Sequence, residues 1–306
     1  MINLSVIDET STLEAVILGT AKGVGDVPKM EDAYDPKSKE HIAAGTFPKE
    51  KDMIEEMEAF AAILEKYGVK VYRPEIIPEY NQVFSRDIGF VIEDKFIKPR
   101  ILKDRKEEIL GIQYVIDQMN PEQVVAAPDG VRIEGGDVMP CKDYIFVGYS
   151  EQEDFEKYTV ARTNKMGVDF LQSLFPHKKV KGFQLNKSDE VAKDNALHLD
   201  CCFQPIGANM AIIYKEGFKE LHEYEFLKNH FGEDNLIHIT RDEMYEMNSN
   251  VFSISRKVVV VEKGFTRLIK VLTEKGFTVE EVPYAEISKM EGLLRCSTLP
   301  LLRKNS

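Results

Sequence analysis

Five short polar segments are spread along the chain, and together they contain a thiol, an imidazole and several carboxylates. A thiolate attacks an electron-poor carbon, an imidazole carries protons to and from the reacting groups, and carboxylates attract a cation. This combination is typical of a nucleophilic cysteine that acts on a cationic substrate. The segments are Arg86-Asp87, Ile133-Glu134-Gly135-Gly136-Asp137, His198-Leu199-Asp200, Asn248-Ser249-Asn250 and Arg295-Cys296-Ser297-Thr298.

Cys296 is the predicted nucleophile among the four cysteines. It lies between Arg295 and Ser297, and a neighbouring cation such as Arg295 favours the reactive thiolate. The alternative is a buried structural cysteine, which is how we interpret the other three. No Cys-x-x-Cys spacing indicates zinc, and no secretion signal indicates disulfides. The other cysteines are Cys141, Cys201 and Cys202.

The segment around His198 is predicted to be a strand, from Leu197 to Phe203. Because side chains alternate across a strand, His198 and Asp200 would share one face, opposite the flanking leucines. Leaving both polar groups buried without partners would cost several kcal/mol, so the pair needs a polar pocket or an internal hydrogen bond. Glu134 precedes a Gly-Gly pair, where the missing side chains let another backbone or a ligand approach closely.

The elements between these segments recur in one order: two short strands, an amphipathic helix, then a further strand. The period of roughly 45–65 residues is typical of blade-like repeats. The last strand, Leu299–Leu302, can pair with Leu13–Leu18 and close a ring around a central channel. The alternative is an ordinary α/β sandwich whose hairpins do not converge. The helices are predicted at about Pro48–Tyr67, through Ile109 to Ile116, and near Val168–Leu174, Leu221–Phe231 and Leu268–Leu272.

The other notable segment is a long loop from Thr20 to Phe47. It contains Asp32, Tyr34 and Asp35, and a loop of this length in a compact domain is often functional. We expect it to form a lid over the channel.

The bulk properties exclude several classes of protein. The net charge of -12 and the pI of 5.2 disfavour nucleic acids and anionic lipid surfaces as partners, and agree with a cationic substrate. No apolar run of roughly 18 residues indicates a membrane span. The first residues lack the basic and apolar regions of a signal peptide, so a cytoplasmic protein is expected. The 306 residues are interpreted as one domain, 1–306.

Taken together, the polar segments resemble those of the arginine deiminase and amidinotransferase superfamily, also called penteins. The resemblance runs over nearly the whole chain, and the segments occur in the same order. Residues 133–140 are similar to the segment with the catalytic glutamate, and residues 292–300 to the segment with the nucleophilic cysteine. The other matching positions are Asn81, Phe84 and Arg86-Asp87 in the first blade, Arg162-Thr163-Asn164, and His198-Leu199-Asp200.

The resemblance implies a fold, a set of catalytic roles and no metal or organic cofactor. The fold would be a five-bladed α/β propeller of ββαβ units around a central active-site channel. Cys296 would attack the guanidinium carbon, His198 would protonate the leaving amine and then activate water, and Glu134 would hold the imidazole. Asp87 and Asp200 would bind the guanidinium. Of the other expected substrate-binding residues, Arg162 and Arg295 would bind a carboxylate. Arg86 would touch substrate or brace Asp87, and Asn250 would hydrogen-bond substrate or cap a turn. Asn81 and Phe84 would line the site.

One departure leaves the substrate and the reaction open. In place of the glycine-rich loop and histidine that precede the cysteine in deiminases, this chain has Glu291-Gly292-Leu293-Leu294-Arg295, whose Gly-Leu-Leu resembles the dimethylarginine hydrolases. We expect hydrolysis of a C–N bond in a small cationic guanidino or ureido compound, such as arginine, a methylarginine or citrulline. The alternatives are amidino transfer to an amine, modification of peptidyl-arginine in an open cleft, and a non-catalytic metabolite-binding propeller. A homodimer is possible.

Overall fold

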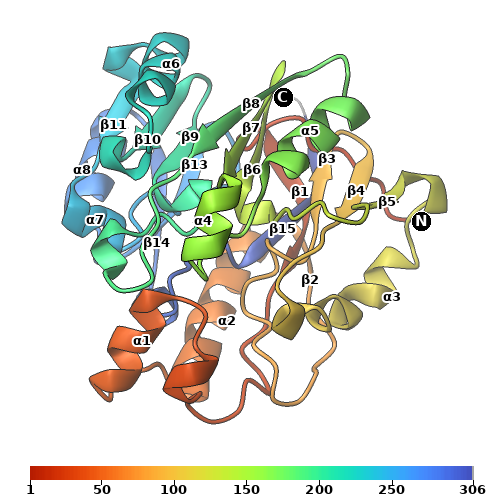
Figure 1. Ribbon diagram of the computed structural model, residues 1–306, viewed down its shortest axis with the longest axis vertical. Helices are drawn as coiled ribbons and strands as arrows, with labels where there is room; N and C mark the ends of the chain where they lie inside the picture. Colours follow the sequence, from red (N-terminus) through yellow and green to blue (C-terminus); the bar gives the residue numbers. More distant parts are fainter. Residues whose placement is uncertain (305–306) are drawn as a thin grey trace.

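The computed structural model describes residues 1–304, and its strands form five separate three-stranded sheets. In every sheet the middle strand pairs antiparallel with one neighbour and parallel with the other. A parallel connection needs a crossover, and helices supply it at the periphery of the molecule, outside the sheets (Figure 1). The predicted five-bladed propeller of ββαβ units is therefore confirmed.

The first sheet joins the two ends of the described chain. Strand β1 (Thr12–Leu18) pairs antiparallel with β15 (Thr298–Lys304), with Leu18 opposite Thr298 and Ile17 opposite Leu299. Strand β2 (Lys70–Tyr72) adds to the other side of β1 in parallel. The predicted pairing of the last strand with the first is confirmed, and it closes the ring of five sheets.

Each of the other four sheets comes from one continuous stretch of chain. Their strands are β3 (Phe90–Ile92), β4 (Lys95–Lys98) and β5 (Val124–Ala126); β6 (Val138–Cys141), β7 (Tyr144–Tyr149) and β8 (Lys179–Gln184); β9 (Phe203–Ile206), β10 (Met210–Ile213) and β11 (Leu236–His238); and β12 (Phe252–Ser253), β13 (Val258–Glu262) and β14 (Thr278–Val282).

Helix α2 shows why the crossover helices form where they do. Its residues Met53, Met57, Phe60 and Leu64 recur at helical spacing and are at most 1% exposed, so they form one apolar stripe against the sheets. Gly68, with φ of +74°, follows its end. The helices are α1 (Pro36–Ala43), α2 (Glu50–Lys66), α3 (Gln113–Ile116), α4 (Gln152–Lys157), α5 (Lys165–Leu174), α6 (Leu221–Phe231), α7 (Arg241–Tyr245), α8 (Thr266–Glu274) and α9 (Ala285–Ser288).

Short 3-10 helices fill many of the connections. The predicted helix through Ile109 to Ile116 is wrong in part, because it divides into the 3-10 helix η3 and the single turn α3. Gly111 lies at this junction, and a Cβ there would come 2.3 Å from Gln82 Nε2. The 3-10 helices are η1 (Met30–Asp32), η2 (Lys103–Arg105), η3 (Glu108–Ile112), η4 (Pro121–Gln123), η5 (Gly135–Asp137), η6 (Ala192–Asp194), η7 (Leu199–Cys201), η8 (Lys215–Gly217) and η9 (Glu233–Asn235).

The loop predicted from Thr20 to Phe47 is partly helical. It contains η1 and the eight-residue helix α1. Asp35 is the N-cap of α1, because its carboxylate accepts a hydrogen bond from Ser38 N at 2.7 Å. The segment is therefore an ordered part of the fold, and it packs beside α2 (Figure 1).

A buried guanidinium links the segment before β1 to three blades. Arg295 has no exposed surface, and it donates to both oxygens of Glu9 at 3.1 and 3.0 Å. It also donates to the carbonyls of Gly136 at 3.2 Å and Val138 at 2.8 Å, and to Asp200 Oδ2 at 2.8 Å. Because these five acceptors come from three segments that are far apart in sequence, Arg295 fixes the positions of the segments relative to one another.

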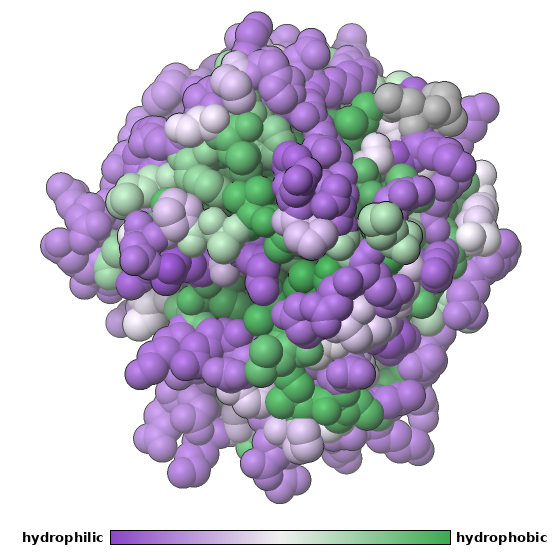
Figure 2. Space-filling model, turned by 90° about the vertical axis from the view of Figure 1, so that its right-hand side faces the viewer, coloured by the Kyte–Doolittle hydropathy of each residue, from purple (hydrophilic) through white to green (hydrophobic). Residues whose placement is uncertain are grey.

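The surface offers little information about partners. Figure 2 shows that apolar side chains reach the surface in patches between hydrophilic ones, on the face that lies to the right in Figure 1. Across residues 1–304, none of the helices has the length and apolar character needed to cross a membrane. The homodimer stays a prediction.

We expect the Glu9→Gln variant to lose stability. Burial opposes the charge of Glu9, but Arg295, Arg86 and Arg303 outweigh it and lower its pKa from 4.5 to about 2. Removing one partner of such a buried ion cluster costs about 3–5 kcal/mol, which denaturant unfolding at pH 7 would measure. The contribution of a lowered pKa is complete above pH 4.5 and is lost as the pH falls through about 2. The difference in the free energy of unfolding between wild type and Glu9→Gln should therefore become smaller as the pH falls from 4.5 to about 2.

The matched control is Glu14→Gln, because Glu14 pairs with Lys304 near the surface. Exposed ion pairs contribute at most about 1 kcal/mol. Equal stability losses in the two variants would contradict a central role for Glu9.

Candidate active site

The five polar segments occupy the same position in each blade. Each lies just before, or at the start of, the edge strand that pairs antiparallel with the middle strand of its sheet. These edge strands are β3, β6, β9, β12 and β15. The structure therefore brings together segments that are far apart in sequence, as the repeat predicts. Glycines make this convergence possible. A Cβ on Gly135 would lie 2.0 Å from the carbonyl oxygen of Arg86, and one on Gly136 would lie 2.6 Å from His198 Nδ1.

The predicted strand from Leu197 to Phe203 is wrong, because β9 begins only at Phe203 and the His-x-Asp segment leads into η7. Asp137 Oδ1 accepts a hydrogen bond from Leu199 N at 2.9 Å, and Cys201 N bonds the carbonyl of His198. These bonds wind the segment into a turn. Alternation therefore does not apply, and Leu197 lines the same pocket as His198.

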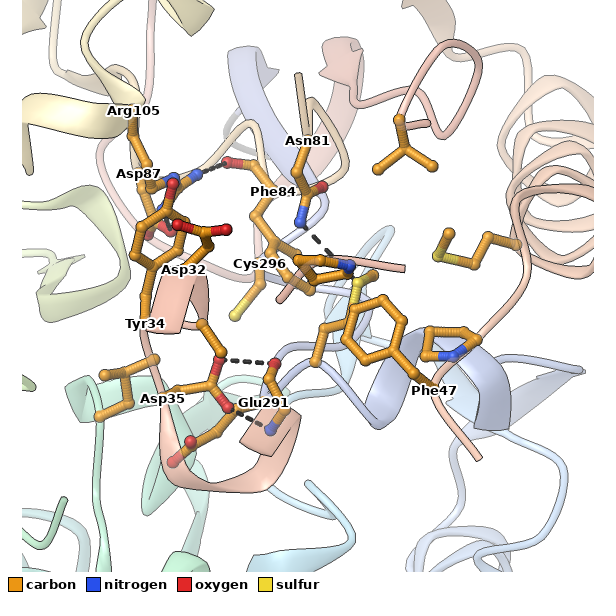
Figure 3. Close-up of a pocket in the computed structure, with 18 of the residues that line it drawn as sticks. Asp32, Tyr34, Asp35, Phe47, Asn81, Phe84, Asp87, Arg105, Glu291 and Cys296 are labelled. Carbon is orange, nitrogen blue, oxygen red and sulfur yellow. Dashed lines mark hydrogen bonds and ion pairs between the residues drawn. The ribbon is translucent and has the colours of Figure 1, made fainter. Parts of the chain in front are cut away.

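A pocket of about 470 Å³ lies where the segments meet. Six of the eleven predicted site residues line it, and the other five are buried beside or behind them. Figure 3 shows the Cys296 sulfur between Asp87 on one side and Glu291 on the other. The predicted residues that line the pocket are Asn81, Phe84, Asp87, Arg162, His198 and Cys296, and those that do not are Arg86, Glu134, Asp200, Asn250 and Arg295.

Asn250 and Asp200 hold the thiol of Cys296. The Asn250 amide donates to the sulfur at 3.1 Å, and its oxygen accepts from Cys296 N at 3.1 Å. The sulfur lies 3.5 Å from Asp200 Oδ2. Burial, Asp200 and Asp87 raise the pKa of the Cys296 thiol well above its ordinary value, and Arg295 counteracts this only weakly. Arg295 thus acts in the direction expected from the sequence, but only weakly, because Glu9 and Asp200 offset the charge of that guanidinium.

His198 and Glu134 form a buried ion pair. His198 Nε2 lies 2.7 Å from Glu134 Oε2. Burial opposes the imidazolium, but Asp87, Asp137 and Glu134 together raise the pKa of His198 to about 9. Burial likewise opposes the Glu134 carboxylate, whose pKa is nevertheless lowered by Arg162 and His198. The resting pair is thus imidazolium and carboxylate, with Nδ1 3.8 Å from Asp87 Oδ1.

Asp87 presents one free oxygen near the imidazolium. Its Oδ2 accepts a hydrogen bond from Arg105 Nη1 at 2.7 Å, whereas its buried Oδ1 has no hydrogen-bond partner. Arg105 is held in turn by both oxygens of Glu108, at 2.8 and 2.9 Å. An unpartnered carboxylate oxygen in a pocket wall is a strong acceptor for a cationic N–H group.

Arg162 connects the site to the segment between residues 20 and 47. Its Nη2 donates to the carbonyl of Tyr34 at 3.0 Å, its Nη1 lies 3.5 Å from Glu134 Oε2, and its buried Nε has no partner. The next two residues of the Arg-Thr-Asn element are structural. Thr163 Oγ1 accepts from Glu134 N at 3.1 Å, and Asn164 caps α5.

Four residues that the sequence predicts to contact substrate bind other parts of the protein. Arg295 is fully engaged with Glu9, Asp200 and two carbonyls, so no donor is left for a substrate carboxylate. Asp200 Oδ2 accepts from Arg295, and its contact with a guanidinium, like that of Asp87, stays a prediction. Arg86 braces the cysteine segment instead of Asp87, through the carbonyl of Arg295 and Thr298 Oγ1, both at 3.3 Å. Asn250 contacts Cys296 and neither caps a turn nor lines the pocket.

Several residues of the site were not predicted. Arg105 and Glu108 lie in a run of charged residues that reads like a solvated surface, and only the fold turns them inward. Glu9 lies outside every polar segment. Glu291 was noted only as part of the altered loop before the cysteine. The polar pocket residues from the 20–47 segment, which was expected to act as a lid, are Asp26, Asp32, Tyr34, Asp35 and Ser38. They form one wall, and movement of that wall stays a prediction.

One cluster has the composition of a metal site. Asp87, Glu134 and His198 each bring one ligand atom to within 4.8 Å of the others. His198 Nε2 and Glu134 are bonded to each other, however, and Arg105 and Arg162 lie on the two carboxylates. A cation would have to displace these contacts, so the arrangement suits proton transfer better than metal binding.

Comparisons with known proteins agree with the fold. Residues 35–303 match the family model of the eukaryotic N,N dimethylarginine dimethylhydrolases. The uncharacterized protein YkgA of Bacillus subtilis is 29% identical over 229 residues, 74% of this chain and 71% of that protein. The N-terminal domain of ArgZ, a cyanobacterial arginine dihydrolase, superposes with a TM-score of 0.76 at 16% identity, covering 94% of this chain and 97% of that one. Inosamine-phosphate amidinotransferase StrB1 of Streptomyces griseus superposes with a TM-score of 0.77 at 17% identity, covering 100% and 98%.

The five-bladed fold and this pocket define an enzyme of the pentein superfamily, which acts on guanidino groups. The match over residues 35–303 shows that the chain belongs to the dimethylarginine dimethylhydrolase family.

We expect Cys296 to react slowly with a neutral alkylating agent at pH 7. Because its pKa is raised well above the ordinary value, the thiolate fraction should increase about tenfold per pH unit from pH 7 to 9. Mass spectrometry of the Cys296 peptide after timed iodoacetamide treatment would measure the rate. Cys141 is partly exposed, but burial raises its pKa to about 12, so its rate should rise with the same slope and serves as an internal reference in the same digest. A rate for Cys296 that levels off below pH 8 would show that this thiol ionises there and would contradict the prediction.

Proposed function

We propose that this protein hydrolyses a C–N bond of arginine, a methylarginine or a related guanidino compound through a covalent amidino-thioether on Cys296. The observation that carries the proposal is the convergence of three groups on one pocket: the Cys296 thiol, the His198 imidazolium and the free oxygen of Asp87. These groups supply a nucleophile, an acid and a guanidinium acceptor. Membership of the dimethylarginine dimethylhydrolase family supports the same reaction.

The charges of the site suit a substrate that brings its own cation. A guanidinium bound by Asp87 would place positive charge beside the sulfur, against the effect of Asp87 and Asp200. The thiol pKa would then fall and its proton would pass to solvent water, so that the sulfur could attack the guanidinium carbon. His198 would give its Nδ1 proton to the departing amine, because Nε2 stays with Glu134. The neutral imidazole would then take a proton from water, whose oxygen displaces the sulfur and leaves a ureido product.

The positions of the other residues support their roles in this scheme. Asn250 would orient the sulfur, and Arg105 would fix Asp87. Arg162, with its free Nε facing no protein acceptor, would bind the carboxylate of an amino acid substrate. Asn81 and Phe84 would form the wall over Gly292, since a Cβ there would come 2.4 Å from the Phe84 ring.

Amidino transfer is the second candidate. It uses the same thioether but lets an amine, instead of water, accept the amidino group. The superposition with the amidinotransferase StrB1 over the full length of this chain supports amidino transfer as the second candidate. A non-catalytic binding protein is disfavoured, because it would have no need of an acid with a raised pKa beside a buried thiol.

A turnover screen tests the proposal directly. Purified protein would be incubated with arginine, monomethylarginine, dimethylarginine, agmatine and citrulline, with and without glycine or ornithine, while released ammonia or methylamines are measured. We expect release without an acceptor, and at least a 10³-fold loss in Cys296→Ser because the nucleophile is removed. Cys141→Ser is the matched control and should keep full activity. Release that requires the added amine would show a transferase, and wild-type activity in Cys296→Ser would contradict the proposal.

The falling limb of the pH profile should report His198. Because its pKa is raised to about 9, the protonated acid is present below that pH and turnover should decline as the pH rises through 9. In Glu134→Gln the imidazolium loses its partner while the burial remains, so this limb should move to lower pH by about one unit or more. Rates measured between pH 5 and 10 would show the shift. An unchanged limb in this variant would mean that another group titrates there.

A further inference from the structure

The pocket wall contains a buried acid that the proposed reaction does not use. Glu291 is 4% exposed and lines the pocket five positions before Cys296. Its Oε1 accepts a hydrogen bond from Asn195 Nδ2 at 2.7 Å, whereas its buried Oε2 has no partner. The backbone at Glu291 has φ of +56°, a conformation that is uncommon for residues other than glycine. The fold thus holds this carboxyl group in one place, with one oxygen left for a donor.

Asp35 places a second carboxyl group beside it. Its two oxygens accept from Ser38 N and Ser38 Oγ, both at 2.7 Å, so its orientation is fixed by the start of α1. Burial and Asp35 raise the pKa of Glu291 well above its ordinary value, while Asn195 and Lys37 act in the opposite direction. Because two adjacent carboxylates repel each other, Glu291 keeps its proton beside Asp35.

The other charged and titratable groups near the pair do not neutralise it. Lys37 donates to the carbonyl of Tyr245 at 2.5 Å, and its ammonium lies 4.4 Å from the centre of the Tyr245 ring. Its pKa is lowered by burial. The remaining neighbours are the Tyr245 hydroxyl and the Cys201 thiol, both with raised pKa values. Within residues 1–304, no ion pair joins Glu291 to a cation.

The shape of this cluster favours an aliphatic ammonium group. A guanidinium is flat and pairs with a carboxylate through two parallel bonds, but Glu291 offers one free oxygen. An ammonium is compact and has three donors that can point to separate oxygens. Figure 3 also shows Asp35 and Glu291 on the far side of the Cys296 sulfur from Asp87 and Arg105, so the pocket has a second acidic region.

We propose that Glu291 and Asp35 form a subsite for an aliphatic ammonium group in the active-site pocket. The ammonium belongs either to the guanidino substrate itself, as in an amino acid, or to a separate amine. The inference rests on the proposed function only in taking the ligand to be a guanidino compound. Binding would exchange the proton of Glu291 for the ammonium, so that Glu291 becomes ionised.

Binding measurements can test the subsite without turnover. The full chain with Cys296→Ser would be titrated by calorimetry with arginine and with 5-guanidinopentanoic acid, which lacks only the ammonium group; dimethylarginine and its des-amino counterpart form a second pair. We expect the amino acids to bind about 10- to 100-fold more tightly, the range for a hydrogen-bonded buried charge. Titrations in buffers of different ionisation enthalpy should show that each amino acid releases about one proton more than its partner.

The same titrations in Glu291→Gln identify the residue responsible. Glutamine keeps an oxygen for Asn195, so the fold should be retained, but it cannot supply the charge. We expect the preference for the amino acids to fall at least about tenfold and the extra proton release to disappear. Glu223→Gln is the matched control, because Glu223 is also a buried acid with a raised pKa but lies outside the pocket. It should behave like the Cys296→Ser parent. If Glu291→Gln is unstable, Glu291→Asp provides the second test through a weakened preference.

Methylammonium chloride distinguishes the two sources of the ammonium. If the subsite takes a separate amine, methylammonium should tighten binding of 5-guanidinopentanoic acid in the parent and have no effect in Glu291→Gln. If the subsite takes the substrate's own ammonium, methylammonium should compete with arginine for the same place. The proposal would be overturned if Glu291→Gln weakened the binding of arginine and of 5-guanidinopentanoic acid by the same factor and if methylammonium had no effect. These titrations are independent of turnover, so failure of the hydrolase proposal would appear separately, as an inactive wild-type enzyme in the screen.

Discussion

The site depends on the buried guanidinium of Arg295. Glu9 and Asp200 neutralise its charge, and two backbone carbonyls take the remaining donors. A buried cation without these partners would be strongly unfavourable, so the groups around it must keep their places. Because Arg295 precedes Cys296 directly and Asp200 follows His198 by two positions, the contact that stabilises the centre of the ring also sets the distance between the thiol and the acid.

The same neutralisation decides the protonation states in the pocket. Because Glu9 and Asp200 offset the charge of Arg295, burial together with Asp200 and Asp87 keeps the proton on Cys296. The carboxylates act on His198 in the opposite sense and keep it charged. The pocket thus holds a neutral thiol and a charged imidazolium. In the proposed reaction a bound cation would lower the pKa of the thiol, so that the thiol would be activated only when such a ligand is bound.

The sequence allowed much of the architecture to be predicted, for identifiable reasons. The spacing of apolar residues located α2, and the uninterrupted apolar runs of β7, β10 and β13 located central strands. The pairing of β15 with β1 followed from the requirement that a sheet should not leave free edges. The turn at His198 was missed because its apolar–polar alternation is the pattern of a strand, while the bond from Leu199 to Asp137 that winds it is between residues far apart in sequence.

The site was predictable to the extent that its chemistry lies in distinctive residue types. Cys296, His198, Asp87 and Arg162 reach the pocket together as expected. The expected roles of Arg295 and Asn250 were less accurate, because a polar residue beside a nucleophile can face the ligand or the protein, and only its partners decide which. Arg105 and Glu291 carry no local signal, since charged residues in sequence are usually solvated and their burial here results from tertiary packing.

The pairing of β1 with β15 also has a consequence for biosynthesis. Strand β1 leaves the ribosome before every other strand of the propeller, and β15 leaves after all of them. Until then, β1 can join β2 but has no partner on its other edge, and the segment with Cys296 has no sheet to enter. A nascent chain that has completed four blades would therefore still have an open ring and no assembled nucleophile. Such a long-range closure is slow, and it exposes a strand edge that chaperones or neighbouring chains can bind.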